Sequence, residues 1–125
     1  MKEHLKILIL EDVEEDVELV RRELMKEKLL FTLYRVDKKD EYLSSLVEIK
    51  PNVILSDHSL PQFNSVEALE ISQRIGSNIP FILVTGTVSE EFAVTCLKNG
   101  ADNYVLKGNL SRLPSAITNA LQQKA

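Results

Sequence analysis

Acidic residues stand directly after two apolar runs of this sequence. Glu11 and Asp12 follow the run at residues 6–10, and Asp57 follows the run at residues 52–56. Carboxylates that lie close together repel one another, which raises a pKa or calls for a cation. Mg²⁺ (or Mn²⁺) suits such a set, because it binds carboxylates, keeps several waters and bridges to phosphate oxygens. An aspartate can also act as a nucleophile and form an aspartyl phosphate.

A hydroxyl and an amine follow two further apolar runs. Thr85 comes after residues 81–84, and Lys107 comes after residues 103–106. Phosphoryl transfer needs positioning and positive charge around the transferred oxygens, which a metal, a lysine and a hydroxyl can supply. Taken singly, each residue has a common alternative, because such an aspartate is often a helix N-cap or turn residue and a lysine is usually a solvated charge. Their convergence favours phosphoryl-transfer chemistry.

The elements that must position these residues are short and alternate regularly. Apolar runs occupy residues 6–10, 31–36, 52–56, 81–84 and 103–106. Strands that alternate with helical segments predict a parallel sheet, since consecutive parallel strands need crossover connections. We therefore expect an α/β fold of the (βα)5 type, doubly wound, with helices on both faces and the run carrying Arg35 at an edge. Ligands of such sheets bind beyond the carboxyl ends of the strands.

Helical segments between the runs carry apolar stripes and end signals. The stripes are Val13, Val17, Val20 and Leu24 in the first segment and Leu110, Leu113, Ile117 and Leu121 in the last. That spacing predicts amphipathic helices. Asn64 with Glu67 resembles a capping box, and Gly100 is a natural helix stop.

Composition bounds the class of protein. A length of 125 residues predicts one domain over 1–125, with no output domain after the fifth helix. The net charge of −4 argues against nucleic-acid binding, which needs basic patches. Cys96 is the only cysteine, so it cannot form an internal disulfide, and we expect it to be a small buried helix residue in a cytoplasmic protein. No stretch reaches the roughly 20 apolar residues of a membrane helix.

Together these residues resemble the receiver domain of two-component response regulators, the CheY-like superfamily. The family pattern is an acidic pair after the first strand, an aspartate after the third, a threonine after the fourth and a lysine after the fifth. The segment "NGADNYVLKGNLSRLPSAI" (residues 99–117) adds similarity around the last strand. The resemblance runs from Lys6 to the last helix. It implies a flavodoxin-like sheet in the order 2-1-3-4-5.

The resemblance also implies a role for each residue of the acidic rim. Asp57 would accept the phosphoryl group from a histidine kinase or phosphotransfer domain. Asp12 would bind Mg²⁺ directly, Glu11 would bind it through water or assist, and Ser59 would offer its backbone carbonyl. The domain would assist its own phosphorylation and dephosphorylation without being a conventional enzyme.

A switch follows from the same resemblance. Thr85 and Lys107 would contact the phosphoryl group, and Tyr104 would change rotamer as the loop after Thr85 moves inward. The fourth helix, fifth strand and fifth helix would then engage an output domain or target protein, and this face is also compatible with a homodimer. We expect neither direct nucleic-acid binding nor membrane binding. The sequence leaves open whether the domain stands alone or comes from a hybrid kinase or larger regulator.

Some positions depart from the family pattern. Gly108 replaces the usual proline after the lysine, so we expect a trans peptide and a differently shaped loop. Gly86 replaces the usual alanine and should loosen the switch loop. Ser65 stands where a glycine is common, and His58 follows the acceptor where an apolar residue is usual. His58 is expected to point away from the site or to modulate turnover.

Two small neutral residues, Ser59 and Thr87, flank the acceptor and could also modulate turnover. The alternative to a phosphoacceptor is a phosphorylation-independent interaction module of the same fold. Enzymes of similar topology fit less well: a haloacid-dehalogenase phosphatase would need a second aspartate at Ser59, and a P-loop hydrolase would need a glycine-rich loop in place of "EDVEEDVE". A flavodoxin would need a hydroxyl-rich loop there.

Overall fold

Five short strands alternate with helices, as the apolar runs predict. The computed structural model describes residues 4–58, 60, 63–75, 78–86 and 90–124. The strands are β1 (Leu5–Leu10), β2 (Phe31–Val36), β3 (Val53–Ser56), β4 (Phe81–Thr85) and β5 (Asn103–Leu106). The helices are α1 (Glu14–Lys26), α2 (Lys39–Glu48), α3 (Ser65–Ile75), α4 (Glu90–Lys98) and α5 (Leu113–Lys124), with a 3-10 helix, η1 (Lys107–Arg112), before α5.

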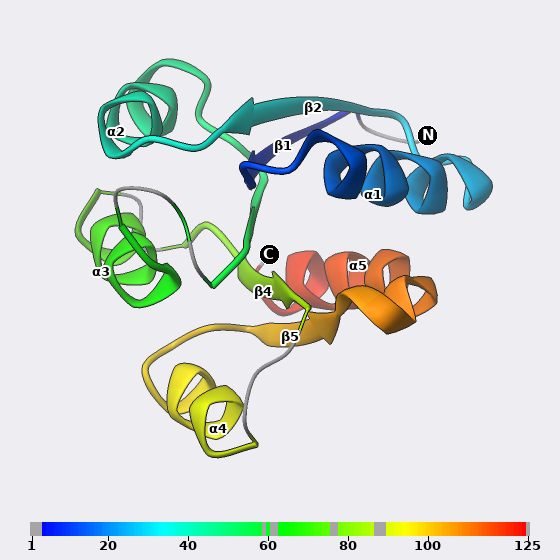
Figure 1. The fold of residues 1–125 in the computed structure, drawn as a ribbon. Coiled ribbons are helices and arrows are strands. Elements are labelled where there is room, and N and C mark those ends of the chain that lie inside the picture. The colour runs from blue at the N-terminus through cyan, green and yellow to red at the C-terminus, as the bar shows by residue number, and fades with distance from the viewer. Residues whose placement is uncertain (1–3, 59, 61–62, 76–77, 87–89, 125) are drawn as a thin grey trace.

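All strand pairs are parallel, and the sheet order is β2-β1-β3-β4-β5 (Figure 1). This confirms the doubly wound, flavodoxin-like fold. It also places β2, which carries Arg35, at an edge. Because the chain goes from β1 outward to β2 and returns to β3 on the other side, strand order reverses between β1 and β3. Ligands of open α/β sheets bind at such a switch point.

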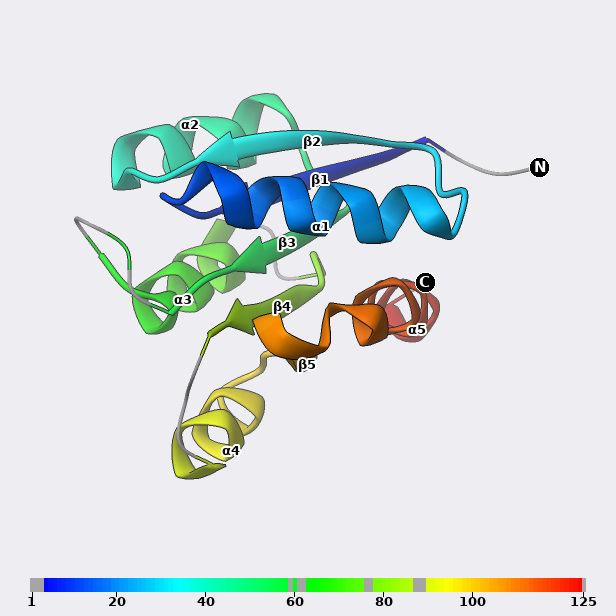
Figure 2. The same cartoon turned by 45° about the vertical axis from the view of Figure 1, so that its right-hand side comes forward.

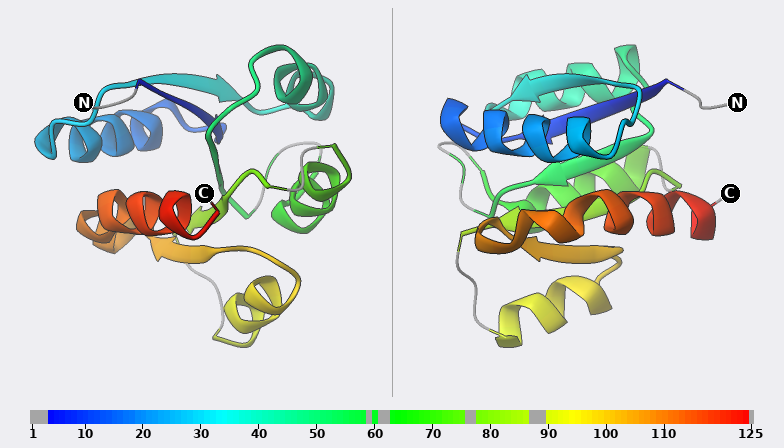
Figure 3. Two further views of the ribbon diagram at one scale, coloured as in Figure 1. Left: turned by 180° about the vertical axis from the view of Figure 1, so that it is seen from behind. Right: turned by 90° about the vertical axis from the view of Figure 1, so that its right-hand side faces the viewer.

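The helices form two layers around the sheet. Helices α1 and α5 cover one face, and α2, α3 and α4 cover the other, a division that the view from behind also shows (Figures 1 and 3). Ile7 and Ile9 of β1 pack with α1 and α5, whereas Leu8 and Leu10 pack with the opposite layer. This alternation is the two-residue repeat of a strand that is buried on both faces. No helix among the described residues has the length and apolar character needed to cross a membrane.

The predicted stripes are correct except at their first residues. In α1, Val17, Val20 and Leu24 are buried, whereas Val13 is 43% exposed. Val13 is the N-cap residue and has an extended backbone, so its side chain falls outside the helical repeat. In the last segment Leu110 is buried as expected but belongs to η1, and α5 begins only at Leu113.

Both predicted helix-end signals are present. The backbone at Gly100 has φ 113°, and the N–H groups of Gly100 and Ala101 donate to carbonyls of the last turn of α4. This is a Schellman ending. At the start of α3, the Asn64 Oδ1 accepts the Glu67 N–H at 3.0 Å, which is half of a capping box. The carboxylate of Glu67 instead pairs with Lys39 of α2 at 3.0 Å.

Candidate functional site

The predicted site residues gather at the carboxyl ends of the strands. The strand arrows point to one edge of the sheet (Figure 2), where Glu11 and Asp12 follow β1 and Asp57 follows β3. The Asp57 N–H donates to the carbonyl of Leu10 at 3.0 Å, so the pairing of β1 with β3 continues to the acid itself. Lys107 begins η1 directly after β5. The sheet order therefore decides which strand ends become neighbours.

Three carboxylates form a compact group at this edge. One oxygen each from Glu11, Asp12 and Asp57 lies within 4.8 Å of the other two. Glu11 is buried, Asp57 is half-buried and Asp12 is exposed. Burial raises the pKa of Glu11, and the charge of Asp57 raises it further, against the lowering effect of the hydrogen bond from Lys107. Hard oxygen donors at this spacing fit Mg²⁺, which would relieve their mutual repulsion.

The ammonium of Lys107 contacts two members of this group, Glu11 and Asp57, and also Asp16. Its Nζ is 2.7 Å from Glu11 Oε1, 2.7 Å from Asp16 Oδ2 and 3.5 Å from Asp57 Oδ2. Burial alone lowers the pKa of Lys107, but the hydrogen bonds to Asp16 and Glu11 and the charges of Glu11 and Asp57 raise it above its usual value. The lysine is therefore a permanent positive charge at neutral pH.

The carboxylate of Asp57 has a defined orientation. Its Oδ1 accepts the backbone N–H of His58 at 2.8 Å, and its Oδ2 faces Lys107. The Ser56 hydroxyl donates to the Asp57 carbonyl at 2.8 Å. The two carboxylate oxygens of Asp57 are thus inequivalent: Oδ1 is held by a backbone N–H, and Oδ2 faces the ammonium of Lys107.

Thr85 and Tyr104 lie on the two strands at the β5 edge of the sheet. Thr85 is the last residue of β4, is buried, and pairs in register with Leu106, the residue before Lys107. Tyr104 of β5 is half-buried against the core on the α2, α3 and α4 side. The Arg112 guanidinium donates to the Tyr104 carbonyl at 3.3 Å.

The imidazole of His58 faces α3 and α4. Its ring centroid lies 4.2 Å from that of Phe92 on α4, and its Nδ1 lies 3.0 Å from the Ser65 hydroxyl at the start of α3. Ser65, at the position where the family commonly has glycine, is buried and supplies this partner. His58 therefore connects the residue next to Asp57 with two helices of one layer.

The structure describes some of the other positions that depart from the family pattern or flank the acceptor. No peptide bond in the described part of the chain is cis, so the Lys107–Gly108 bond is trans as predicted. The loop that follows is η1, interrupted by a non-helical Asn109. Gly86 lies in an exposed bend, where a Cβ would meet no atom within 4 Å. Ser59 and Thr87 lie outside the described residues.

Two polar residues at the site were missed by the sequence analysis. Asp16 lies in the first turn of α1, only four residues after Asp12, and this closeness in sequence to the acidic pair is a signal that could have been used. Arg35 donates from Nε to the Glu11 carbonyl at 3.0 Å and from a terminal nitrogen to the Asp12 carbonyl at 3.3 Å. Arg35 of β2 thereby holds the backbone of the acidic turn, Glu11–Asp12. The contact forms because β1 and β2 are neighbours in the sheet.

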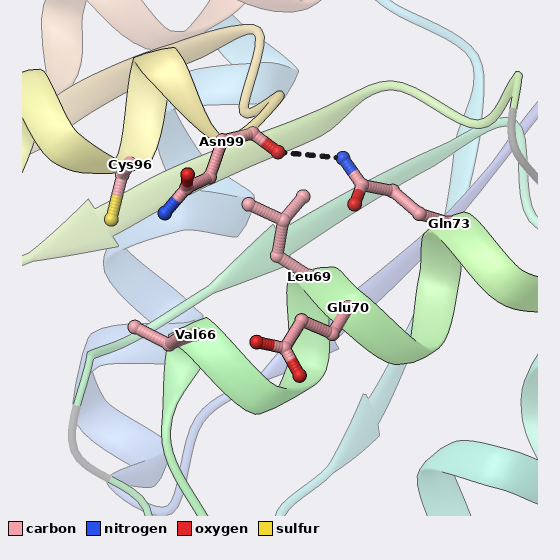
Figure 4. A pocket seen from close by; sticks show the side chains of 6 residues that line it. All are labelled: Val66, Leu69, Glu70, Gln73, Cys96 and Asn99. Atoms are coloured by element: carbon pink, nitrogen blue, oxygen red, sulfur yellow. Dashed lines mark hydrogen bonds between the residues drawn. The ribbon is translucent and has the colours of Figure 1, made fainter.

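A separate hollow of about 200 Å³ lies between α3 and α4 (Figure 4). Its lining residues are Val66, Leu69, Glu70, Gln73, Cys96 and Asn99. In Figure 4 the Gln73 amide reaches across to the carbonyl of Asn99, a hydrogen bond of 2.8 Å that ties the two helices together. Cys96 is buried, as predicted, and burial raises the pKa of its thiol. The hollow shares no residue with the carboxylate group.

Comparisons with known proteins agree with this geometry. The family model described as the response regulator receiver domain matches residues 7–118. The chain is similar to a protein-glutamate methylesterase/protein-glutamine glutaminase of Treponema pallidum (strain Nichols), with 36% identity over 67 residues, or 52% of this chain and 17% of that protein. It is also similar to the regulatory protein AtoC of Escherichia coli (strain K12), with 33% identity over 81 residues, or 64% of this chain and 18% of that protein.

The chain thus spans less than a fifth of the length of these two curated relatives. Among solved structures, its fold is similar to a response regulator receiver domain protein from Clostridium thermocellum, with a TM-score of 0.83 and 23% identity over 96% of each chain. The family match covers most of the sequence, and the residues it covers include every member of the carboxylate group. The chain therefore belongs to the response regulator receiver domain family of two-component signalling.

Proposed function

We propose that this chain is a phosphoacceptor in which Asp57 receives a phosphoryl group from a phosphohistidine of a histidine kinase or phosphotransfer domain. The observation that supports this most directly is the compact group of Glu11, Asp12 and Asp57, of which one oxygen each lies within 4.8 Å of the other two, beside a lysine ammonium that contacts Glu11 and Asp57. Such a group concentrates a nucleophile, a cation site and a positive charge at one edge of the sheet. All three are requirements of phosphoryl transfer.

The donor set fits a resident Mg²⁺ (or Mn²⁺). Asp12 and Asp57 would coordinate it directly, Glu11 would bind it through water or assist, and the backbone carbonyl of Ser59 is a further expected ligand. The bound ion supplies positive charge to the oxygens of the transferred group. Glu11 also positions Lys107, because its Oε1 accepts the ammonium at 2.7 Å.

The chain's own residues define the transfer step. The Asp57 Oδ2 attacks the phosphorus, a P–O bond forms, and the P–N bond to the donor imidazole breaks with its electron pair leaving on nitrogen. The N–H of His58 keeps the other oxygen of Asp57 in place at 2.8 Å. Lys107, already 3.5 Å from Oδ2, would contact the phosphoryl oxygens.

The arrival of charge at Asp57 is the proposed switch. Thr85, at the end of β4, would hydrogen-bond the phosphoryl group, and Tyr104 of β5 would turn in behind it. A local electrostatic change of this kind biases a two-state surface. The surface would be α4, β5 and α5, facing an output domain, a target protein or a second copy of the chain. His58 would modulate the lifetime through its contacts with α3 and α4, and Ser59 and Thr87 would do so beside the acceptor.

We further propose that residues 1–125 act as one receiver domain with no catalytic turnover of a separate substrate. Any output activity would then belong to another domain or partner. The greater length of the curated relatives is compatible with this arrangement.

Phosphorylation can be tested with acetyl phosphate and Mg²⁺, followed by intact-mass spectrometry. The native protein should gain one phosphoryl group that is lost on treatment with hydroxylamine. Asp57→Asn should gain none, whereas Asp40→Asn, which changes an exposed aspartate of α2, should behave like the native protein. Equal labelling of Asp57→Asn and the native protein would show that the acceptor is a different residue.

The second candidate is a phosphorylation-independent interaction module. Gly86 and Gly108, which replace the usual alanine and proline of the family, are the observations in its favour. Mg²⁺ titration by calorimetry separates the two functions, because an interaction module of this fold has no need of the ion. Binding that disappears in Asp12→Asn supports the phosphoacceptor.

A further inference from the structure

Asp16 is a third carboxylate at the ammonium of Lys107, beside Glu11 and Asp57. It lies in the first turn of α1, and its Oδ2 is 2.7 Å from the Nζ of Lys107. The Oδ2 of Asp57 is 3.5 Å from the same nitrogen. A distance near 2.7 Å is that of a strong charge-assisted hydrogen bond, whereas 3.5 Å is at the limit of one. The lysine is therefore bound more closely to Asp16 than to the proposed acceptor.

We propose that Asp16 is a positioning residue that holds the ammonium of Lys107 away from Asp57 until a phosphoryl group arrives. This inference rests on the proposed function of Asp57. In the structure described here, Lys107 would be in its resting position, shared between Asp16 and Glu11. Phosphorylation would make it exchange partners.

The hydrogen-bonding capacity of the ammonium supports this exchange. A lysine has three N–H donors, and two of them meet Glu11 and Asp16 at 2.7 Å. A phosphoryl group on Asp57 adds three strong acceptor oxygens and close to two negative charges, compared with the single charge of the carboxylate. The ammonium can then form a stronger ion pair with the phosphoryl group by leaving Asp16, the carboxylate that is not part of the metal group. Glu11, Asp12 and Asp57 form that group, and Asp16 lies outside it.

The position of Asp16 allows it to release the lysine. Its side chain is 26% exposed, so its carboxylate can be solvated by water when the ammonium leaves. Its place in the first turn of a helix also favours a negative charge there. By contrast, the Glu11 side chain is 4% exposed, and losing the lysine would remove an ion pair of 2.7 Å from a buried carboxylate that little water can solvate. Asp16 is the contact that costs less to break.

The consequence is that Asp16 opposes the phosphorylated state. Replacing it with a neutral residue should make Lys107 available to the phosphoryl group at no cost, and so strengthen binding of a phosphoryl analogue. For a partly exposed ion pair we expect an increase in affinity of about fivefold.

The test uses beryllofluoride at saturating Mg²⁺ with the full chain, measured by calorimetry. Asp16→Asn should bind it about fivefold more tightly than the native protein. The matched control is Glu15→Gln, which removes a negative charge from an exposed residue of the same helical turn and should change the affinity by less than about twofold. Urea unfolding of each variant confirms that it is folded.

A double-mutant cycle with Lys107→Met decides whether the effect passes through the lysine. In the Lys107→Met background, Asp16→Asn should leave beryllofluoride affinity unchanged. An effect that persists there, or an Asp16→Asn affinity equal to or below that of the native protein, overturns the inference while leaving Asp57 as the acceptor. If the native protein does not bind beryllofluoride with Mg²⁺, the proposed function itself fails, and this inference fails with it.

Discussion

Neutralising Asp57 should stabilise the metal-free protein. Its carboxylate lies within 4.8 Å of the oxygens of Glu11 and Asp12 and 3.5 Å from the Lys107 ammonium. At an effective dielectric constant of about 20, each repulsion costs about 3.5 kcal/mol and the attraction contributes about 4.7 kcal/mol. Because Asp12 is exposed, water screens its share of the repulsion by roughly half. The balance is a net repulsion of about 0.5 kcal/mol.

Asp57→Asn removes this charge with little change of shape. The asparagine Oδ1 can still accept the N–H of His58, so the local hydrogen bond is kept. In urea with EDTA, we expect the unfolding midpoint of Asp57→Asn to lie about 0.2–0.5 M above that of the native protein. In saturating Mg²⁺ the order should reverse, because ligand binding stabilises the native site and the variant has lost one of its ligands.

Glu70→Gln is the matched control, because it removes one charge from an exposed residue of α3 that lines the separate hollow and is not a member of the carboxylate group. It should change the midpoint little in either buffer. If Asp57→Asn is no more stable than Glu70→Gln in EDTA, the repulsion argued here is wrong. A gain that is equal with and without Mg²⁺ would instead remove Asp57 from the metal site.

Three further predictions concern the turn around the site and a helix end. Since the pKa of Glu11 is raised above its ordinary value of 4.5, the metal-free protein should lose stability as pH rises from there through the raised pKa. Glu11→Gln should remove that part of the pH dependence in urea titrations with EDTA, and an unchanged profile would exclude Glu11 as its source. Arg35→Met should lower stability by about 1 kcal/mol and weaken Mg²⁺ binding severalfold by calorimetry, because it releases two carbonyls of the acidic turn. Arg35→Lys should not restore the binding, since one ammonium cannot reproduce the guanidinium fork. Gly100→Ala should cost about 1–2 kcal/mol, because the backbone has φ 113° and a Cβ would meet the Gln73 side chain. Gly108→Ala, at a position with open space, should cost less than about 0.5 kcal/mol, and equal losses would contradict the role of φ.

Local patterns were sufficient for the elements of the fold. Each predicted apolar run coincides with a strand to within one residue at either end. Apolar residues that repeat every two residues in a strand, or every 3.6 residues in a helix, mark the face that is buried. Such a repeat is visible in the sequence without knowing which other element packs against that face. Val13 was misassigned because an apolar residue at a helix start fits the repeat while its backbone does not yet follow the helix. Apolarity alone also could not separate η1 from α5, because Leu110 of η1 continues the apolar stripe of α5.

Part of the site is also predictable, because ligands of open α/β sheets bind beyond the carboxyl ends of the strands. This rule predicts that Glu11, Asp12 and Asp57 share one edge, and the observed spacing agrees. It says nothing about which oxygen of Asp57 faces the cation or where the imidazole of His58 points. Those orientations depend on single hydrogen bonds and on the ring of Phe92, contributed by a helix more than thirty residues further along the chain.

The sequence by itself determined the alternation of strands and helices, the acidic and basic residues that end the strands, and the family to which they point. These are properties of residue types and short spacings. Only the tertiary structure decided how the charges are shared. Lys107 and Asp16 are 91 residues apart, and they meet because α1 and η1 are brought together by the reversal of strand order and by burial of their apolar sides. Which carboxylate an ammonium prefers depends on differences of less than 1 Å between packed elements, and no local pattern encodes such distances.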